Sequence, residues 1–314
     1  MPAQNEINIV FASDDNYIQH ATVAMMSILQ NTNPKNKLHF WILDDNITQN
    51  NKERVIATFL NKNVKIEFLQ VNAEVFASLF VSGQLSRTAY FRLKMAELLP
   101  VSVSRVIYLD CDLLVLGDIE ELWNCDMEGK PLAAIPDYGI MASSKDWPRK
   151  QHELVLKSTD MYFNSGVLLV DVDAWRLHNY EQRVLRLAQE NNYQHHDQDA
   201  LNKIFYAKWK ALPLRWNVIP PIWNLFLKIL RNSKFRREAL QARKNIAILH
   251  YAGGYKPWEY KEIPSFNAGY YRYFRKTAFC NVEMPQFDHR RKGRSIRRQL
   301  YRLRLADFWQ WLLD

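Results

Sequence analysis

Glycine is scarce in this chain, with 9 residues in 314. Neither G-x-G-x-x-G nor G-x-x-x-x-G-K-S/T occurs, which argues against a dinucleotide-binding Rossmann enzyme and a P-loop nucleotidase. His152 and Glu153 are not followed by a histidine at position 156, so the H-E-x-x-H motif of zincin metalloproteases is absent. No G-x-S-x-G occurs either, which argues against an α/β-hydrolase. Three cysteines without a C-x-x-C pair argue against a disulfide framework and a cysteine-ligated zinc site.

Long hydrophobic runs are also missing. The longest apolar stretch, residues 218–230, is interrupted by two prolines, an asparagine and a lysine, so no ~20-residue membrane span is expected. The first 15 residues contain neither the basic nor the apolar region of a secretory signal peptide. We therefore expect a cytoplasmic protein whose contact with a membrane is peripheral.

The net charge of +9 is concentrated in two segments. Residues 290–304 hold eight Lys and Arg and no acid, so the rest of the chain carries +1. Residues 228–244 hold seven basic residues and one acid, and without this net +6 the remainder carries −5. The body of the protein is thus mildly acidic, and its basic character belongs mainly to the tail.

Strand-like and helix-compatible stretches alternate at the spacing of βαβ units in the first 71 residues. Strands are expected over residues 7–12, 38–44 and 64–71, with helices over 19–30 and 50–60. This order predicts an α/β fold with a mostly parallel sheet and helices on both faces. Since no linker divides the chain, we expect one domain over residues 1–285, followed by a tail over 286–314.

Two further apolar runs, residues 105–110 and 166–171, both end on carboxylates. Ligands of open α/β sheets bind outside the carboxyl ends of strands, so the site is sought there. In Asp110-Cys111-Asp112 the two acids are two positions apart, which places them on one side of an extended chain. Such a pair suits Mg²⁺ or Mn²⁺ completed by a diphosphate, although a polar strand exit or a helix cap would also explain it.

A second loop supplies groups that suit a diphosphate. His250 ends a strand-like run at 246–249 and is followed by Gly253, Gly254 and Lys256. The imidazole would be a third metal ligand and favours Mn²⁺, glycine lets the backbone approach phosphate oxygens, and the lysine neutralises them. The alternative is a β-turn beside a histidine with ordinary hydrogen bonds.

Six motifs follow one another between about residues 7 and 260. They lie at residues 11–17, 88–93, 106–112, 162–169, 197–202 and 250–258. Together they resemble the family 8 retaining glycosyltransferases, especially the bacterial lipopolysaccharide and lipooligosaccharide α-galactosyl- and α-glucosyltransferases. Two positions depart from the family pattern: Cys111 replaces an aliphatic residue, and Ser165 stands where a close relative has alanine.

The resemblance implies a GT-A fold that binds UDP-galactose or UDP-glucose through a divalent metal, Mn²⁺ or, as the alternative, Mg²⁺. The residues at the matching positions would divide into three groups. Ala12, Asp14, Asn16 and Tyr17 would hold the nucleoside, with Tyr17 stacked on the base, and Gly253 and Lys256 would hold the diphosphate. Asp110, Asp112 and His250 would bind the metal, and Arg92, Asn164, Ser165, Asp197 and Gln198 would surround the donor sugar.

Retention of the anomeric configuration can proceed by double displacement or by front-face attack within an ion pair. Gln198 offers an amide that could lie near the anomeric carbon, and Asp197 and Asp199 are the nearest carboxylates in sequence. We favour front-face transfer, with the metal and Lys256 stabilising the departing UDP and a phosphate oxygen assisting acceptor deprotonation. Asp199 as nucleophile is the alternative, as is Asp199 positioning Arg92 or the sugar.

The tail has apolar residues at helical spacing, arginines between them, and Trp309 and Trp311 near its end. Such a basic amphipathic helix suits an anionic inner membrane surface, where the acceptor would be a lipid-linked glycan. Packing on the body or a solvated charged arm is the alternative. Alternative functions are nucleic-acid binding through the tail, nucleotidyl transfer and a self-glucosylating glycan primer. No nucleic acid is expected as a partner. The sequence leaves open the donor sugar, the acceptor and its linkage, and the oligomeric state; residues 80–85 are expected on the acceptor side.

Overall fold

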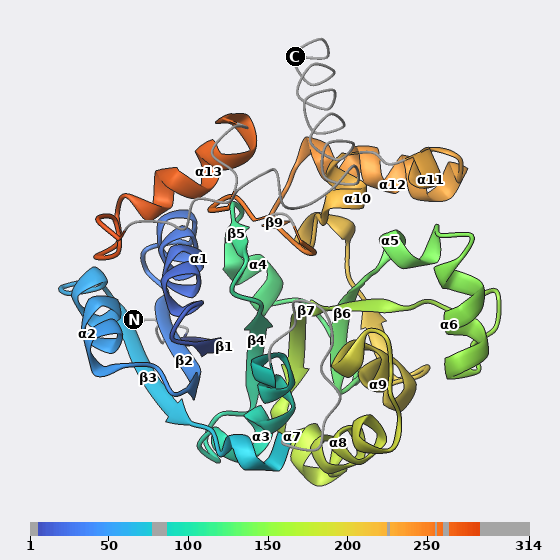
Figure 1. Cartoon of the computed structure of the whole chain (residues 1–314), viewed down its shortest axis with the longest axis horizontal. Coiled ribbons are helices and arrows are strands. Elements are labelled where there is room, and N and C mark those ends of the chain that lie inside the picture. The colour runs from blue at the N-terminus through green and yellow to red at the C-terminus, as the bar shows by residue number, and fades with distance from the viewer. Residues whose placement is uncertain (1–5, 77–86, 225–226, 255, 260–263, 283–314) are drawn as a thin grey trace.

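A computed structural model describes residues 6–76, 87–224, 227–254, 256–259 and 264–282 (Figure 1). Its main sheet has seven strands in the order β3-β2-β1-β4-β7-β6-β8. The expectations for the tail, residues 286–314, and for residues 80–85 lie outside the described residues. The strands are β1 (Glu6–Asp14), β2 (Lys37–Asp45), β3 (Val64–Gln70), β4 (Arg105–Leu109), β6 (Leu132–Pro136), β7 (Phe163–Asp171) and β8 (Trp209–Ala211).

The sheet is mostly parallel, as the sequence predicts. Strands β3, β2, β1 and β4 run parallel, and β8 runs parallel to β6, but β7 is antiparallel to both of its neighbours. Asp171 at the end of β7 therefore pairs with Arg105 at the start of β4. The expectation that both acid-ended strands point at one site is wrong for Asp171, whose carboxylate instead accepts a hydrogen bond from Ala174 N (2.8 Å). Because β7 is antiparallel to β4, the start of β7 lies beside the end of β4, where the site was expected.

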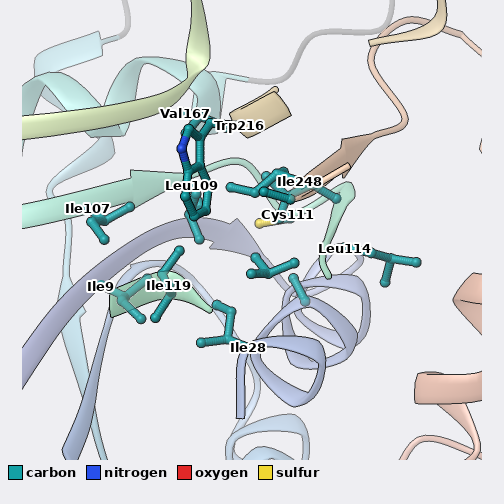
Figure 2. Close-up of a cluster of buried hydrophobic side chains, with 14 of the residues drawn as sticks. Ile9, Ile28, Ile107, Leu109, Cys111, Leu114, Ile119, Val167, Trp216 and Ile248 are labelled. Atoms are coloured by element: carbon teal, nitrogen blue, oxygen red, sulfur yellow. The ribbon is translucent and has the colours of Figure 1, made fainter. Parts of the chain in front are cut away.

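Helices cover both faces of the sheet because strand residues alternate between two cores. In β1, Ile7, Ile9 and Phe11 face one core, whereas Val10 and Ala12 face the other. Figure 2 shows the first core beside Cys111, where residues from β1, β4 and β7 meet Trp216 and Ile248.

The first core is closed by α1 (Ile18–Asn31) and α13 (Pro264–Phe274), which contact each other. The second is closed by helices on the opposite face. The other helical segments are α2 (Gln49–Thr58), η1 (Ala73–Phe76), η2 (Arg87–Lys94), α3 (Met95–Leu98), α4 (Ile119–Trp123), α5 (Tyr138–Met141), α6 (Asp146–Leu154), α7 (Val172–Leu177), α8 (Tyr180–Glu190), α9 (His196–Ile204), η3 (Leu214–Trp216), α10 (Pro220–Trp223), α11 (Leu227–Leu230) and α12 (Ser233–Lys244).

A second, two-stranded sheet joins the two sequence regions that carry the predicted metal ligands. Strand β5 (Leu113–Val115) pairs antiparallel with β9 (Ile248–His250), and Leu113 lies opposite His250. The pairing brings the histidine next to the acids that precede β5. Among the described helices, none is long and apolar enough to cross a bilayer.

Candidate active site

A cavity of about 480 Å³ opens where β1 and β4 end and β7 begins. It brings together thirteen of the fifteen residues expected at the site. Asn16 is exposed and does not line it, and Asp199 is buried behind it. The expected residues that line it are Ala12, Asp14, Tyr17, Arg92, Asp110, Asp112, Asn164, Ser165, Asp197, Gln198, His250, Gly253 and Lys256.

Three potential metal ligands converge in this cavity. His250 Nε2 lies 3.1 Å from Asp112 Oδ1 and 3.8 Å from Asp110 Oδ2. One ligand atom from each residue lies within 4.8 Å of the other two. Two carboxylate oxygens and an imidazole nitrogen form a donor set that suits Mn²⁺ or Mg²⁺. The residues therefore fit a divalent cation chemically and in their spacing.

Asn217, which sequence reasoning missed, fixes the direction of the histidine. Its Nδ2 donates to Asn164 Oδ1 at 2.8 Å, and its Oδ1 lies 2.8 Å from His250 Nδ1. Because Asn217 Oδ1 can only accept, His250 Nδ1 carries a proton, and the ring is turned so that Nε2 points toward the two acids. Such outer hydrogen bonds orient metal-binding histidines in proteins. No motif points to Asn217, because it lies 33 residues before its partner.

Gly166 provides the space that this cluster needs. A Cβ at this position would lie 2.4 Å from His250 Cε1 and 2.6 Å from Asp110 Oδ2, closer than atoms can approach. The backbone of Gly166 also accepts a hydrogen bond from Asp110 N (2.9 Å). Glycine is required here by close approach rather than by an unusual backbone angle.

Lys256 lies beside the cluster and pairs with Asp112, while its Nζ also donates to Tyr251 O at 2.9 Å. Burial alone would raise the pKa of Asp112, but Lys256 and His250 outweigh it and hold that pKa far below its ordinary value. Asp112 therefore stays ionised, as a metal ligand must.

Arg92 links Asp110, one of the three potential metal ligands, to Asp197. Its guanidinium lies 2.9 Å from Asp110 Oδ1 and 3.1 Å from Asp197 Oδ2, and it donates to Ser165 O at 2.6 Å. Burial raises the pKa of Asp197, and the Arg92 charge opposes that rise. The side chain also lies over the ring of Tyr108, so its position is fixed on several sides.

Tyr17 lines the cavity and packs against two aromatic rings that lie outside the cavity lining. Asp14 Oδ1 accepts hydrogen bonds from the backbone of Asn16 (3.0 Å) and of Tyr17 (2.8 Å), which shapes the turn after β1. The ring of Tyr17 meets the edges of His20 and Trp258, and these two stack at 3.6 Å. Burial lowers the pKa of His20 to about 3, so the ring is neutral.

Gln198 lines the cavity, and both ends of its side-chain amide are hydrogen-bonded. Its Oε1 accepts from Ser165 N at 3.0 Å, and its Nε2 donates to Tyr162 Oη at 3.0 Å. Its neighbour Asp199 is fully buried and faces away from the cavity, so the structure does not bring this carboxylate to the other site residues.

The model of Glycosyl transferase family 8 matches residues 8–262. General stress protein A of Bacillus subtilis (strain 168) is 33% identical over 286 residues, which cover 89% of this chain and 96% of that protein. Lipopolysaccharide 1,2-glucosyltransferase of Escherichia coli (strain K12) is 26% identical over 254 residues, covering 80% and 72%. The solved structure of galactosyltransferase LgtC with donor and acceptor sugar analogs has a TM-score of 0.74 at 27% identity, covering 93% of this chain and 100% of that chain.

The sheet, its two helical layers and the cavity at the strand ends define a glycosyltransferase with the GT-A fold. The chain belongs to glycosyl transferase family 8. The expected family and fold class are thereby confirmed.

Proposed function

We propose that this protein is a metal-dependent, retaining hexosyltransferase that moves galactose or glucose from a UDP-sugar to a sugar hydroxyl of a lipopolysaccharide- or lipooligosaccharide-type acceptor. The observation that carries the proposal is the convergence of Asp110, Asp112 and His250 in the cavity. Similarity to a lipopolysaccharide glucosyltransferase and to LgtC, solved with donor and acceptor sugar analogs, supports the substrate class.

In this proposal the three ligands hold Mn²⁺ or Mg²⁺. The bound ion would supply positive charge against the diphosphate leaving group. Lys256 supplies a second positive charge, and Gly253, which has a positive φ of 88° and is exposed, lets the backbone approach phosphate oxygens. Tyr17 and Asp14, which line the cavity after β1, hold the nucleoside.

The donor sugar then lies among Arg92, Asp197 and Gln198, beside the start of β7. We propose front-face transfer for the retaining step. Support comes from Asp199, whose oxygens are bound by Lys150 and Tyr162 outside the cavity lining, where they are poorly placed for attack on a sugar. Gln198 is the side chain that we place beside the anomeric carbon.

We also propose that the enzyme works at the inner face of the cytoplasmic membrane, held there by its tail. The eight basic residues of 290–304 would meet anionic lipids, each contributing about 1 kcal/mol. The acceptor would then be a growing lipid-linked glycan, and no nucleic acid is expected as a partner.

Calorimetric titration of UDP with Mn²⁺, and then with EDTA, tests this proposal. We expect binding that chelation abolishes and that Asp112→Asn removes while the fold is retained. Asp173→Asn is the matched control, because this acid is exposed and lies in α7, outside the cavity lining. No UDP binding in either condition would refute the proposal. Turnover of UDP-galactose against UDP-glucose then identifies the donor, and hexose mass increments on the chain itself would indicate a self-glucosylating primer.

A further inference from the structure

A fully buried lysine lies behind the cavity without touching it. Lys150 in α6 and Asp199 in α9 both have no exposed surface, and neither lines the cavity. A buried ion pair costs desolvation energy, and an apolar pair of similar size would often be as stable. Stability alone therefore does not account for the pair.

Asp199 receives hydrogen bonds from three donors. Lys150 Nζ lies 2.5 Å from Oδ2, and the backbone N–H of His195 donates to the same oxygen at 2.9 Å. The hydroxyl of Tyr162 donates to Oδ1 at 2.6 Å. All three partners donate, so Asp199 acts only as an acceptor.

This acceptor fixes the hydroxyl of Tyr162. The hydroxyl has one proton, which points at Asp199, so it can only accept from Gln198 Nε2 at 3.0 Å. Burial raises the pKa of Tyr162 well above its ordinary value, and the proton is therefore retained.

The amide of Gln198 consequently has one direction. Its nitrogen faces Tyr162 and, at 3.4 Å, Asp137 Oδ2, and neither of these residues lines the cavity. Its oxygen faces Ser165, which does line the cavity and whose N–H lies 3.0 Å away; the Ser165 hydroxyl is at 3.5 Å. The oxygen is thus the end of the amide on the cavity side.

We propose that Lys150 and Tyr162 are positioning residues for glycosyl transfer: acting through Asp199, they set the direction of the Gln198 amide so that its oxygen faces the donor sugar. The inference rests on the proposed function for its catalytic consequence. We call Lys150, Asp199 and Tyr162 the relay. The Gln198 oxygen stabilises the donor sugar most when positive charge develops at the anomeric carbon, so loss of the relay lowers kcat more than it raises KM.

A purely structural role for Lys150 is testable, since the chain offers a matched lysine. Lys203 in α9 donates to Leu154 O at 2.7 Å and so also ties α9 to α6, whereas the ammonium group that pairs with Asp199 is that of Lys150. For the tyrosine, Tyr273 in α13 is a buried control whose hydroxyl accepts from Asn31 Nδ2 at 2.8 Å.

The first readout needs no activity. In protein labelled with 15N-glutamine, the side-chain amide signal of Gln198 is assigned by its loss in Gln198→Glu. Tyr162→Phe and Lys150→Met should both shift this signal, although Lys150 does not touch Gln198, and Lys203→Met and Tyr273→Phe should leave it in place. An unmoved signal in Tyr162→Phe, which removes a single hydroxyl, overturns the inference even if Lys150→Met fails to fold.

The second readout is the rate of transfer. Each relay variant should lower kcat about 10- to 100-fold with a much smaller change in KM for the UDP-sugar. The Lys150→Met/Tyr162→Phe double variant should be about as slow as the slower single variant, because residues acting as one unit are not additive. Losses that multiply, or an equal loss in Lys203→Met, overturn the inference. A wild-type protein inactive on every UDP-sugar refutes the proposed function, whereas the amide signal still decides the relay.

Discussion

Substitution of Gly166 tests the proposed metal site most directly, because this residue touches two of the three potential ligands. In Gly166→Ala the new Cβ would lie 2.4 Å from His250 Cε1 and 2.6 Å from Asp110 Oδ2, where ordinary contacts begin at 3.4 Å. One or both ligands must therefore move by about 1 Å. Since Gly166 lies within β7 and does not have a positive φ, alanine fits the backbone itself.

A displacement of this size should weaken metal-dependent UDP binding about 10- to 100-fold. Mutations of residues that orient metal ligands have effects of this size in other metalloproteins. The assay is calorimetric titration of UDP at fixed Mn²⁺, with circular dichroism and thermal melting to show that the chain is folded. Transfer should fall by about two orders of magnitude, since misplacements near 1 Å cost that much in other enzymes.

Gly269→Ala is the matched control. Its Cβ would meet its nearest neighbour, Leu114 Cδ1, at 3.5 Å, an ordinary contact. We expect this variant to bind UDP as the wild type does. If a folded Gly166→Ala protein bound UDP with wild-type affinity and metal dependence, the reasoning would be refuted. Displacing Asp110 or His250 would then have no effect on the proposed metal site.

Three further predictions follow from other parts of the molecule. Asn217→Leu removes the partner of His250 Nδ1 and should lower Mn²⁺ affinity about tenfold in a titration monitored by calorimetry; unchanged affinity would contradict the assigned ring orientation. His20 has its pKa lowered from 6.5 to about 3, so the stability that its neutral form contributes is complete above pH 6.5 and is lost as pH falls. Between pH 7 and 5 the wild type should lose about 2 kcal/mol more unfolding free energy than His20→Phe, which keeps the stacked ring but binds no proton; equal losses in urea titrations would disprove this. Deleting residues 286–314 should release the protein from anionic liposomes and leave transfer to a soluble acceptor intact, whereas undiminished sedimentation with the liposomes would place the membrane contact elsewhere.

Much of the site was predictable because its residues lie in short motifs at strand ends. The pattern Asp110-Cys111-Asp112 after an apolar run, and His250 after another, predicted the cluster that the structure brings together. Other parts were beyond local pattern. Neither Asn217 nor Lys150 belongs to a motif, and each acts on a residue distant in the chain.

The sequence by itself determined the alternation of strands and helices, the two cores and the residue types at the site, because side-chain period and turn chemistry are local properties. The tertiary structure decided the direction of β7, which moves Asp171 away from the site and places Gly166 beside Asp110. It also decided that Asp199 faces a buried lysine rather than the cavity. Strand direction and side-chain partners of this kind depend on contacts between distant segments, and those contacts exist only once the chain has packed.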